Sequence, residues 1–217
     1  MAEVEDIADA EEPLADAEEP EVSEARAELD PETRARRDAA LRHVRKLGDP
    51  VLRAGAIAVE RFDETLRAEI ERMGELMSDA LGIGLAANQI GVLHRVLVYR
   101  TNAEDDITAL VNPIVEWSSD ELETAEEGCL SLPEVLLEVE RPAQVRVRAR
   151  DGSGEEVLVE AEGLEARVIQ HEIDHLDGVL ILDRVSRAER KEAMRAMREA
   201  QQGGAQQDGA QREASVA

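Results

Sequence analysis

Two histidines four residues apart, His171 and His175, carry the clearest chemical signature in this chain. They belong to the pattern H-E-x-x-H, which reads His171-Glu172-Ile173-Asp174-His175, in a stretch with helical spacing. Because successive residues of an α-helix turn by about 100°, positions i and i+4 lie on one face and both imidazoles can bind one metal ion. Glu172 follows the first histidine, where a carboxylate can take a proton from a water held by the ion. The pattern predicts a metal-dependent hydrolase; the alternative is a chance match on a charge-rich helix.

A catalytic zinc or iron centre usually has three protein ligands and one open position, so a third ligand is needed. The metzincin pattern H-E-x-x-H-x-x-G-x-x-H fails, because Ile181 occupies the position of its last histidine and cannot bind a metal. A thermolysin-type ligand would lie further downstream, in a charge-rich segment that we expect to be solvated. The acidic residues there are Glu189, Glu192 and Glu199. The remaining candidate is Cys129, which we expect in a polar loop; its thiolate suits zinc or ferrous iron, and its alternative role is that of a small buried hydrophobe.

The surrounding segments predict an α+β fold, with antiparallel strands around a central metal-binding helix and a C-terminal helix. The metal-binding helix is expected at residues 163–176, and an amphipathic helix at 63–81 that Gly82 ends. The expected strands cover residues 92–99, 108–115, 135–140, 143–150 and 155–160. The closing helix is expected from residue 186 to about residue 200, with Glu189 completing a capping box.

The composition limits the partners and the compartment. Among 217 residues, Asp and Glu number 50 against 25 Lys and Arg, a formal net charge of −25, so neither nucleic acid nor an anionic membrane is expected as a direct partner. The single cysteine, Cys129, excludes an intrachain disulfide and fits a reducing compartment. The sequence shows no membrane-spanning run and no signal or transit peptide pattern, so we expect a cytoplasmic protein.

Charge and apolar content also divide the chain into three parts. Residues 1–38 are rich in Ala, Glu, Asp and Pro and are predicted to be a disordered acidic extension, although residues 31–41 could alternatively form a short helix. Residues 39–200 are predicted to be a metallohydrolase domain. Residues 201–217, rich in Gln, Gly and Ala, are predicted to be a disordered tail.

Three segments, in this order, closely resemble the signature motifs of the peptide deformylase family. They read G-I-G-L-A-A-N-Q at residues 82–89, E-G-C-L-S at 127–131 and Q-H-E-I-D-H-L-D-G at 170–178. The first segment alone would indicate only a tight connection with small residues packed under a strand. The resemblance extends over about residues 41–200, and three motifs in order make it specific.

The resemblance implies one divalent metal ion, Fe²⁺ in the first place and Zn²⁺ or Ni²⁺ as substitutes. The implied ligands are Cys129, His171 and His175. Glu172 is implied as the general acid/base, and the Gln89 side chain and the backbone N–H of Leu130 as donors to an oxyanion. We expect substrate-binding residues in the same motifs, namely Ile83, Gly84 and Gly128. Gln170 and Asp174 are candidates for orienting the loop or the imidazoles, although Asp174 could equally be a solvated helix carboxylate.

The implied substrate is the N-formylmethionyl end of newly synthesised polypeptides, from which the formyl group is released as formate; nascent chains near the ribosome are the expected partners. A metallo-endopeptidase or another metal-dependent amidase is the main alternative enzyme. A catalytically silent binding protein is a second alternative, but it should have lost a ligand, Glu172 or Gln89. A closed structural metal site is a third, and it would need a fourth ligand from His43 or His94.

Overall fold

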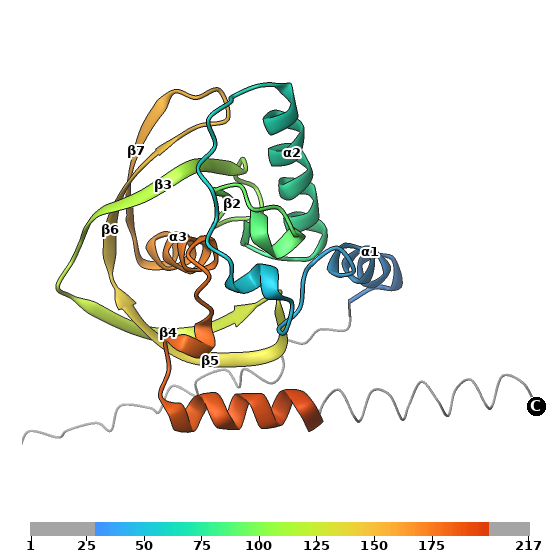
Figure 1. Cartoon of the computed structure of the whole chain (residues 1–217). Helices are drawn as coiled ribbons and strands as arrows, with labels where there is room; N and C mark the ends of the chain where they lie inside the picture. Colours follow the sequence, from blue (N-terminus) through green and yellow to red (C-terminus); the bar gives the residue numbers. More distant parts are fainter. Residues whose placement is uncertain (1–28, 200–217) are drawn as a thin grey trace, which may run out of the picture.

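The computed structural model describes residues 29–199 and combines helices with two antiparallel sheets, which confirms the predicted mixture of helices and antiparallel strands (Figure 1). The expectation of disorder for residues 1–28 and for residues 201–217 falls outside the described residues. Within residues 29–199, no helix combines the length and apolar character needed to cross a bilayer.

The larger sheet has five strands in the order β1-β2-β3-β6-β7, and β4 and β5 form a separate two-stranded sheet. The bounds are β1 (Gly84–Ala86), β2 (Val96–Tyr99), β3 (Thr108–Ser118), β4 (Leu122–Cys129), β5 (Leu132–Pro142), β6 (Gln144–Arg150) and β7 (Glu156–Glu162). In β6 the side chains alternate as expected: Val145 and Val147 are buried, whereas Arg146 and Arg148 are exposed. This alternation places one face of the sheet against the core.

Two strands differ from the predicted ranges for local reasons. The strand expected at residues 92–99 begins only at Val96, because the backbone before it bonds elsewhere: Ile57 N–H donates to Leu93 O at 2.6 Å, and Ile57 forms an isolated parallel bridge with His94. The strand expected at 108–115 continues to Ser118, because β3 keeps pairing with β6 through that residue.

The segment around Cys129 was expected to be a loop, and this expectation is wrong. Leu122–Cys129 forms β4, with Cys129 as its last residue, and β4 pairs with β5 along its whole length. Most side chains of β4 are exposed, so the segment has no apolar period that would mark it as a strand. Pairing with the apolar strand β5 determines its conformation instead.

Helix α3 (Gly163–Leu176) covers the predicted range 163–176 and lies between the larger sheet and the β4–β5 pair (Figure 1). Ten of its 14 residues are buried, so it is packed on several sides rather than on one stripe. Its apolar residues, Ile169 and Leu176 among them, join a core cluster with the inner faces of β2, β6 and β7. The helix is therefore held rigidly where its polar residues can meet β4.

The other helices cover the remaining faces. Helix α2 (Glu64–Asp79) begins at Asp63, whose Oδ1 accepts the N–H groups of Thr65 and Leu66, and its apolar face packs on β1 and β2. It ends at Asp79, before the predicted stop at Gly82. Residues 187–199 are helical; the predicted capping box is present, since Ser186 N–H donates to Glu189 Oε2 at 2.8 Å and Glu189 N–H to Ser186 Oγ at 3.3 Å.

Helix α1 (Pro31–Leu41) is the short helix that we considered as the alternative for this segment. Asp30 is its N-cap, with Oδ1 accepting from Glu32 N–H at 3.1 Å and Thr33 N–H at 3.0 Å. The expected disordered extension therefore does not reach residue 38. Figure 1 shows α1 beside the end of α2, with which it is in contact.

Candidate metal centre

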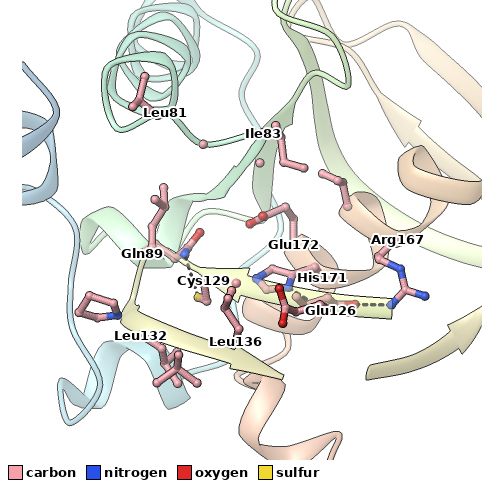
Figure 2. Close-up of a pocket in the computed structure, with 18 of the residues that line it drawn as sticks. Leu81, Ile83, Gln89, Glu126, Cys129, Leu132, Leu136, Arg167, His171 and Glu172 are labelled. Carbon is pink, nitrogen blue, oxygen red and sulfur yellow. Dashed lines mark hydrogen bonds and ion pairs between the residues drawn. The ribbon is translucent and has the colours of Figure 1, made fainter. Parts of the chain in front are cut away.

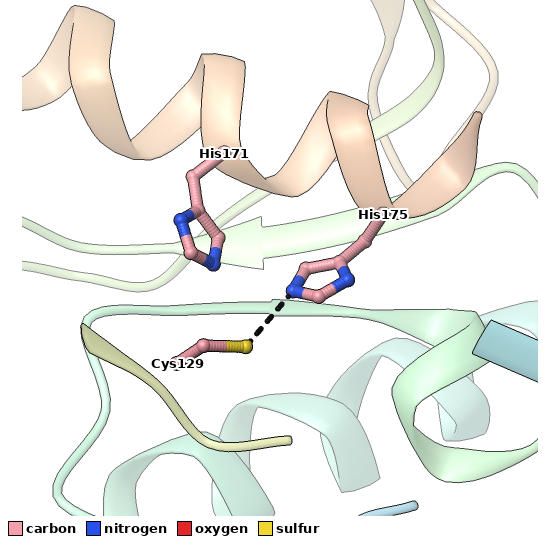
Figure 3. Close-up of side chains that lie close together, drawn as sticks. All are labelled: Cys129, His171 and His175. Carbon is pink, nitrogen blue, oxygen red and sulfur yellow. Dashed lines mark hydrogen bonds between the residues drawn. The ribbon is translucent and has the colours of Figure 1, made fainter. Parts of the chain in front are cut away.

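Cys129, His171 and His175 come together where the end of β4 meets α3 (Figure 3). One ligand atom from each residue lies within 4.8 Å of the others, and Cys129 Sγ is 3.2 Å from His175 Nε2. The two imidazoles project from successive turns of α3, with ring centroids 5.0 Å apart. Within residues 29–199, this is the one group of three or more potential ligands that is compact enough to hold a metal ion.

The donor set fits a divalent transition metal. A thiolate and two imidazoles match the ligand types of zinc and ferrous iron and leave a fourth position for water or substrate. Burial alone would raise the pKa of the Cys129 thiol, but the imidazoles of His175 and His171 outweigh it and bring this pKa well below its usual range. The site therefore stabilises the thiolate, which is the form that binds a metal.

His171 is oriented by a carboxylate that sequence reasoning missed. Its Nδ1 lies 2.9 Å from Glu127 Oε2, so its Nε2 is left for the ligand cluster. Glu127 is 6% exposed. Burial raises the pKa of its carboxyl, but the bonds from His171 and Arg141 prevail and lower it to about 2. Glu127 thus remains ionised and holds the ring in place.

A buried network extends behind Glu127. Arg141 donates to Glu127 Oε1 at 2.6 Å and to Oε2 at 3.0 Å, and Arg167 donates to Oε1 at 2.8 Å. Arg141 also donates to Asp174 Oδ2 at 2.9 Å, as does Arg184. Asp174 is 6% exposed, so the alternative of a solvated helix carboxylate is wrong; it bonds the arginines and not the imidazoles. The network joins α3 to β4 and β5.

Glu172 lies beside the cluster with one carboxylate oxygen unpaired. It is 4% exposed, and its Oε2 has no hydrogen-bond partner among the described residues. Burial raises the pKa of this carboxyl, although the neighbouring His171 and His175 act in the opposite direction. A Cβ atom on Gly84 would overlap the Glu172 carboxylate, so any other residue at this position would push that carboxylate aside. Gly84 therefore contributes the space that Glu172 occupies.

Gln89 and Leu130 lie on the other side of the cluster. Gln89 Oε1 accepts Ala86 N–H at 2.8 Å, and its Nε2 donates to Ser131 Oγ at 3.3 Å and lies 3.8 Å from Cys129 Sγ. These bonds fix the amide with its N–H groups toward the candidate metal site. Leu130 directly follows Cys129 and lines the same cleft.

These residues open onto a cleft with a volume of about 540 Å³. Figure 2 shows Cys129, His171 and Glu172 gathered within it. Its walls are largely apolar and include the exposed side chains of Leu81, Ile83, Leu136 and Leu164. The expected substrate-binding residues Ile83, Gly84 and Gly128 all line it. The cleft can thus take an extended ligand with one apolar side chain next to the reactive groups.

Comparison with known proteins identifies the family of this chain. The family model described as polypeptide deformylase matches residues 41–191. The peptide deformylase of Parafrankia sp. is 42% identical over 161 residues, covering 74% of this chain and 87% of the relative. Peptide deformylase 1 of Corynebacterium glutamicum is 48% identical over 161 residues, covering 73% of this chain and 95% of the relative.

This chain belongs to the polypeptide deformylase family. Solved structures agree: a peptide deformylase from Legionella pneumophila superposes with a TM-score of 0.71 at 39% identity, covering 75% of this chain and 96% of the other. A peptide deformylase from Synechococcus elongatus in complex with actinonin superposes with a TM-score of 0.68 at 44% identity, covering 70% of this chain and 85% of the other. The chain is accordingly an enzyme of the deformylase class, which acts on formylated nascent peptides.

Gln170, His94 and His43 are not part of the cluster of Cys129, His171 and His175. Gln170 Nε2 donates to Pro142 O and to Ala166 O, both at 3.0 Å, so it holds the end of β5 against α3. His94 Nδ1 is 2.7 Å from Glu69 Oε2 and is exposed, and neither His94 nor His43 joins the candidate ligand cluster. Within the described part of the chain, a closed structural metal site therefore has no fourth ligand.

Proposed function

We propose that this enzyme removes the formyl group from the N-terminal formylmethionine of newly synthesised polypeptides in a metal-dependent reaction and releases formate. Three metal-binding side chains within 4.8 Å of one another, beside the unpaired oxygen of Glu172 in a largely apolar cleft, support this proposal best. Cys129, His171 and His175 would hold the ion. We propose Fe²⁺ as the ion, with Zn²⁺ or Ni²⁺ as substitutes, because a mixed thiolate and imidazole set suits all three.

When bound, the divalent ion would lower the pKa of a water and polarise the formyl carbonyl. The residues of the chain would then handle the proton. Glu172 Oε2 would take a proton from the attacking water, and the same carboxyl would return it to the leaving amine nitrogen. Burial, which raises the pKa of this carboxyl, suits a group that must hold a proton between the two steps.

Two donors would stabilise the negative charge that develops on the formyl oxygen. The Gln89 amide is fixed by Ala86 and Ser131 with its N–H groups toward the site, and the backbone N–H of Leu130 would be the second donor. A donor that is held in position before the reaction needs no reorganisation, and loss of one such donor typically costs about 10²–10³ in rate. Glu127 would have a different role, which is to fix the ring of His171 for binding the ion.

The cleft would bind the methionine side chain against its apolar wall, with Ile83, Gly84 and Gly128 among its lining residues. The small formyl group would lie beside the ligand cluster and the Glu172 carboxylate. Nascent chains near the ribosome would be the substrates, without direct binding of nucleic acid, since the formal net charge of −25 opposes it. A free thiolate at Cys129 can be oxidised and suits a reducing compartment, for which we propose the cytoplasm.

Replacing Glu172 tests this mechanism. Glu172→Ala should retain one equivalent of metal and lose about 10²–10⁴ in kcat, because general acid–base catalysis typically contributes that factor. Formate release from a formyl-Met dipeptide and elemental analysis of the purified protein measure the two effects. Turnover near the wild-type rate would refute the role of Glu172. The main alternative, a metallo-endopeptidase, predicts that wild-type enzyme cleaves a longer unformylated peptide instead.

A further inference from the structure

Helix α1 forms part of the substrate cleft although almost all of it precedes the family match. The match begins at residue 41, which is the last residue of α1 (Pro31–Leu41). Arg37 and Leu41 nevertheless line the cleft, as does Leu81, which follows the end of α2. Since α1 is in contact with α2, it is a fixed part of this wall and not a separate arm (Figure 1). This chain therefore has a cleft wall from outside the region that defines the family.

Arg37 adds a positive charge to that wall. Among the described residues, the Arg37 guanidinium has no hydrogen bond or ion pair, and its side chain is half-buried. Arg167, the other arginine in the cleft, is already bound by Glu127 at 2.8 Å and by the carbonyls of Val139 and Glu123. Arg37 is thus the arginine of the described cleft that can pair with a ligand.

A second cation, Lys46, lies near Arg37. Lys46 donates to Leu130 O at 2.8 Å, which places its ammonium group beside the strand end that carries Cys129. Burial lowers the pKa of Lys46, Cys129 acts in the opposite direction, and the nearby charge of Arg37 adds to the lowering. Because Lys46 is engaged with a carbonyl, Arg37 remains the more available partner for a ligand carboxylate.

We propose that Arg37 is a specificity-determining residue that favours acidic side chains immediately after the formylmethionine of the peptide substrate. The inference rests on the proposed function, because it concerns the same cleft. An extended peptide advances about 3.3–3.6 Å per residue, so residues after formylmethionine must leave the cluster along the cleft walls. The substrate residues that pass along α1 would contact Arg37, which offers a positive charge, and Leu41, which offers an apolar surface.

The test compares three C-terminally amidated peptides: formyl-Met-Glu-Glu, formyl-Met-Lys-Lys and formyl-Met-Gln-Gln. The quantity measured is the ratio of kcat/KM for the Glu peptide to kcat/KM for the Lys peptide, in the full-length metal-loaded enzyme. The wild-type ratio alone does not show whether Arg37 favours acidic side chains, because the net charge of −25 attracts cationic peptides at long range. The change of the ratio on substitution isolates the local effect of Arg37.

Arg37→Gln should lower this ratio about two- to fivefold, the size expected for one partly exposed ion pair. Arg37→Glu should lower it further. The matched control is Arg36→Gln, which removes the same charge from an exposed neighbour on α1 and should leave the ratio at the wild-type value. Added salt should reduce the difference between wild type and Arg37→Gln. Thermal unfolding followed by circular dichroism shows whether each variant is folded.

An unchanged ratio in folded Arg37→Gln and Arg37→Glu, or an equal fall in Arg36→Gln, would overturn the inference. Neither result would affect the proposed function, which is tested by the neutral peptide. If wild-type enzyme released no formate from formyl-Met-Gln-Gln amide, the proposed function itself would fail. Measurable turnover of that peptide with an unchanged charge ratio would leave the function in place and remove only the role of Arg37.

Discussion

The substitution Glu127→Gln removes the charge that holds His171 in position. Glu127 accepts four bonds, two from Arg141 and one each from Arg167 and His171, at 2.6–3.0 Å. Glutamine has one acceptor oxygen, so its NH₂ group must face a donor. Among the described residues, Arg167 then loses its carboxylate partner and Arg141 keeps only Asp174. Breaking a buried ion pair by removing one partner costs about 3–5 kcal/mol. At about 2–4 °C per kcal/mol for a chain of this size, Tm should fall by roughly 6–20 °C.

The same substitution should weaken metal binding, because the His171 ring loses its orienting carboxylate. Such outer partners typically contribute about 10–100-fold in metal affinity. Thermal unfolding of the chelator-treated protein measures the first effect, and Zn²⁺ titration against a chromophoric chelator measures the second. Glu126→Gln is the matched control: its side chain is exposed, and its Tm should stay within about 1–2 °C of wild type. Wild-type Tm and Zn²⁺ affinity in Glu127→Gln would refute the reasoning.

Three further substitutions test other parts of the site and the fold. Gly84→Ala should displace the Glu172 carboxylate and lower kcat at least about 100-fold with metal content unchanged; wild-type turnover would contradict the close contact. Ser131→Ala should free the Gln89 amide and lower kcat about fivefold, the value of one hydrogen bond, whereas an effect on KM alone would contradict a role in positioning. Burial raises the pKa of Asp183, but an arginine ion pair outweighs it and lowers this pKa, so ionised Asp183 stabilises the fold above pH ~4. Asp183→Asn should therefore lower Tm at pH 7, and the difference from wild type should shrink as the pH falls below about 4; a constant difference would contradict the ion pair.

The sequence pattern was sufficient to predict α3 and the three residues that meet at its surface. The i and i+4 spacing places His171 and His175 on one helix face whatever surrounds them, so local geometry alone brings these two rings together. Cys129 was identified by excluding the other candidates, and the structure places it beside His175. Their role as metal ligands remains a prediction.

The environment of these residues was harder to predict, because it depends on β4. Its exposed, acidic residues have no apolar period, so the segment was taken for a loop. Once β4 is known to be a strand, residues two apart share a face, which places Glu127 on the same side as Cys129. The spacing between Glu127 and Cys129 could therefore have indicated that Glu127 faces the ligand cluster, but only if the segment had been predicted to be a strand.

The contributions of Arg141, Arg167 and α1 depend on tertiary packing. Arg141 ends up beside both Glu127 and Asp174 only because β5 crosses next to α3. Similarly, the residues of α1 predict at most a short helix, and only its contact with α2 brings Arg37 to the cleft. No spacing along the chain encodes either arrangement, because each joins segments far apart in sequence.

X-ray absorption of the zinc-loaded enzyme tests the central claim most directly, namely that one ion is held by Cys129 together with two imidazoles. We predict one Zn–S distance of about 2.3 Å and two Zn–N distances of about 2.0–2.1 Å, with the sulfur contribution lost in Cys129→Ala. A spectrum of the wild-type enzyme without a sulfur ligand would contradict the proposed metal centre and the chemistry built on it.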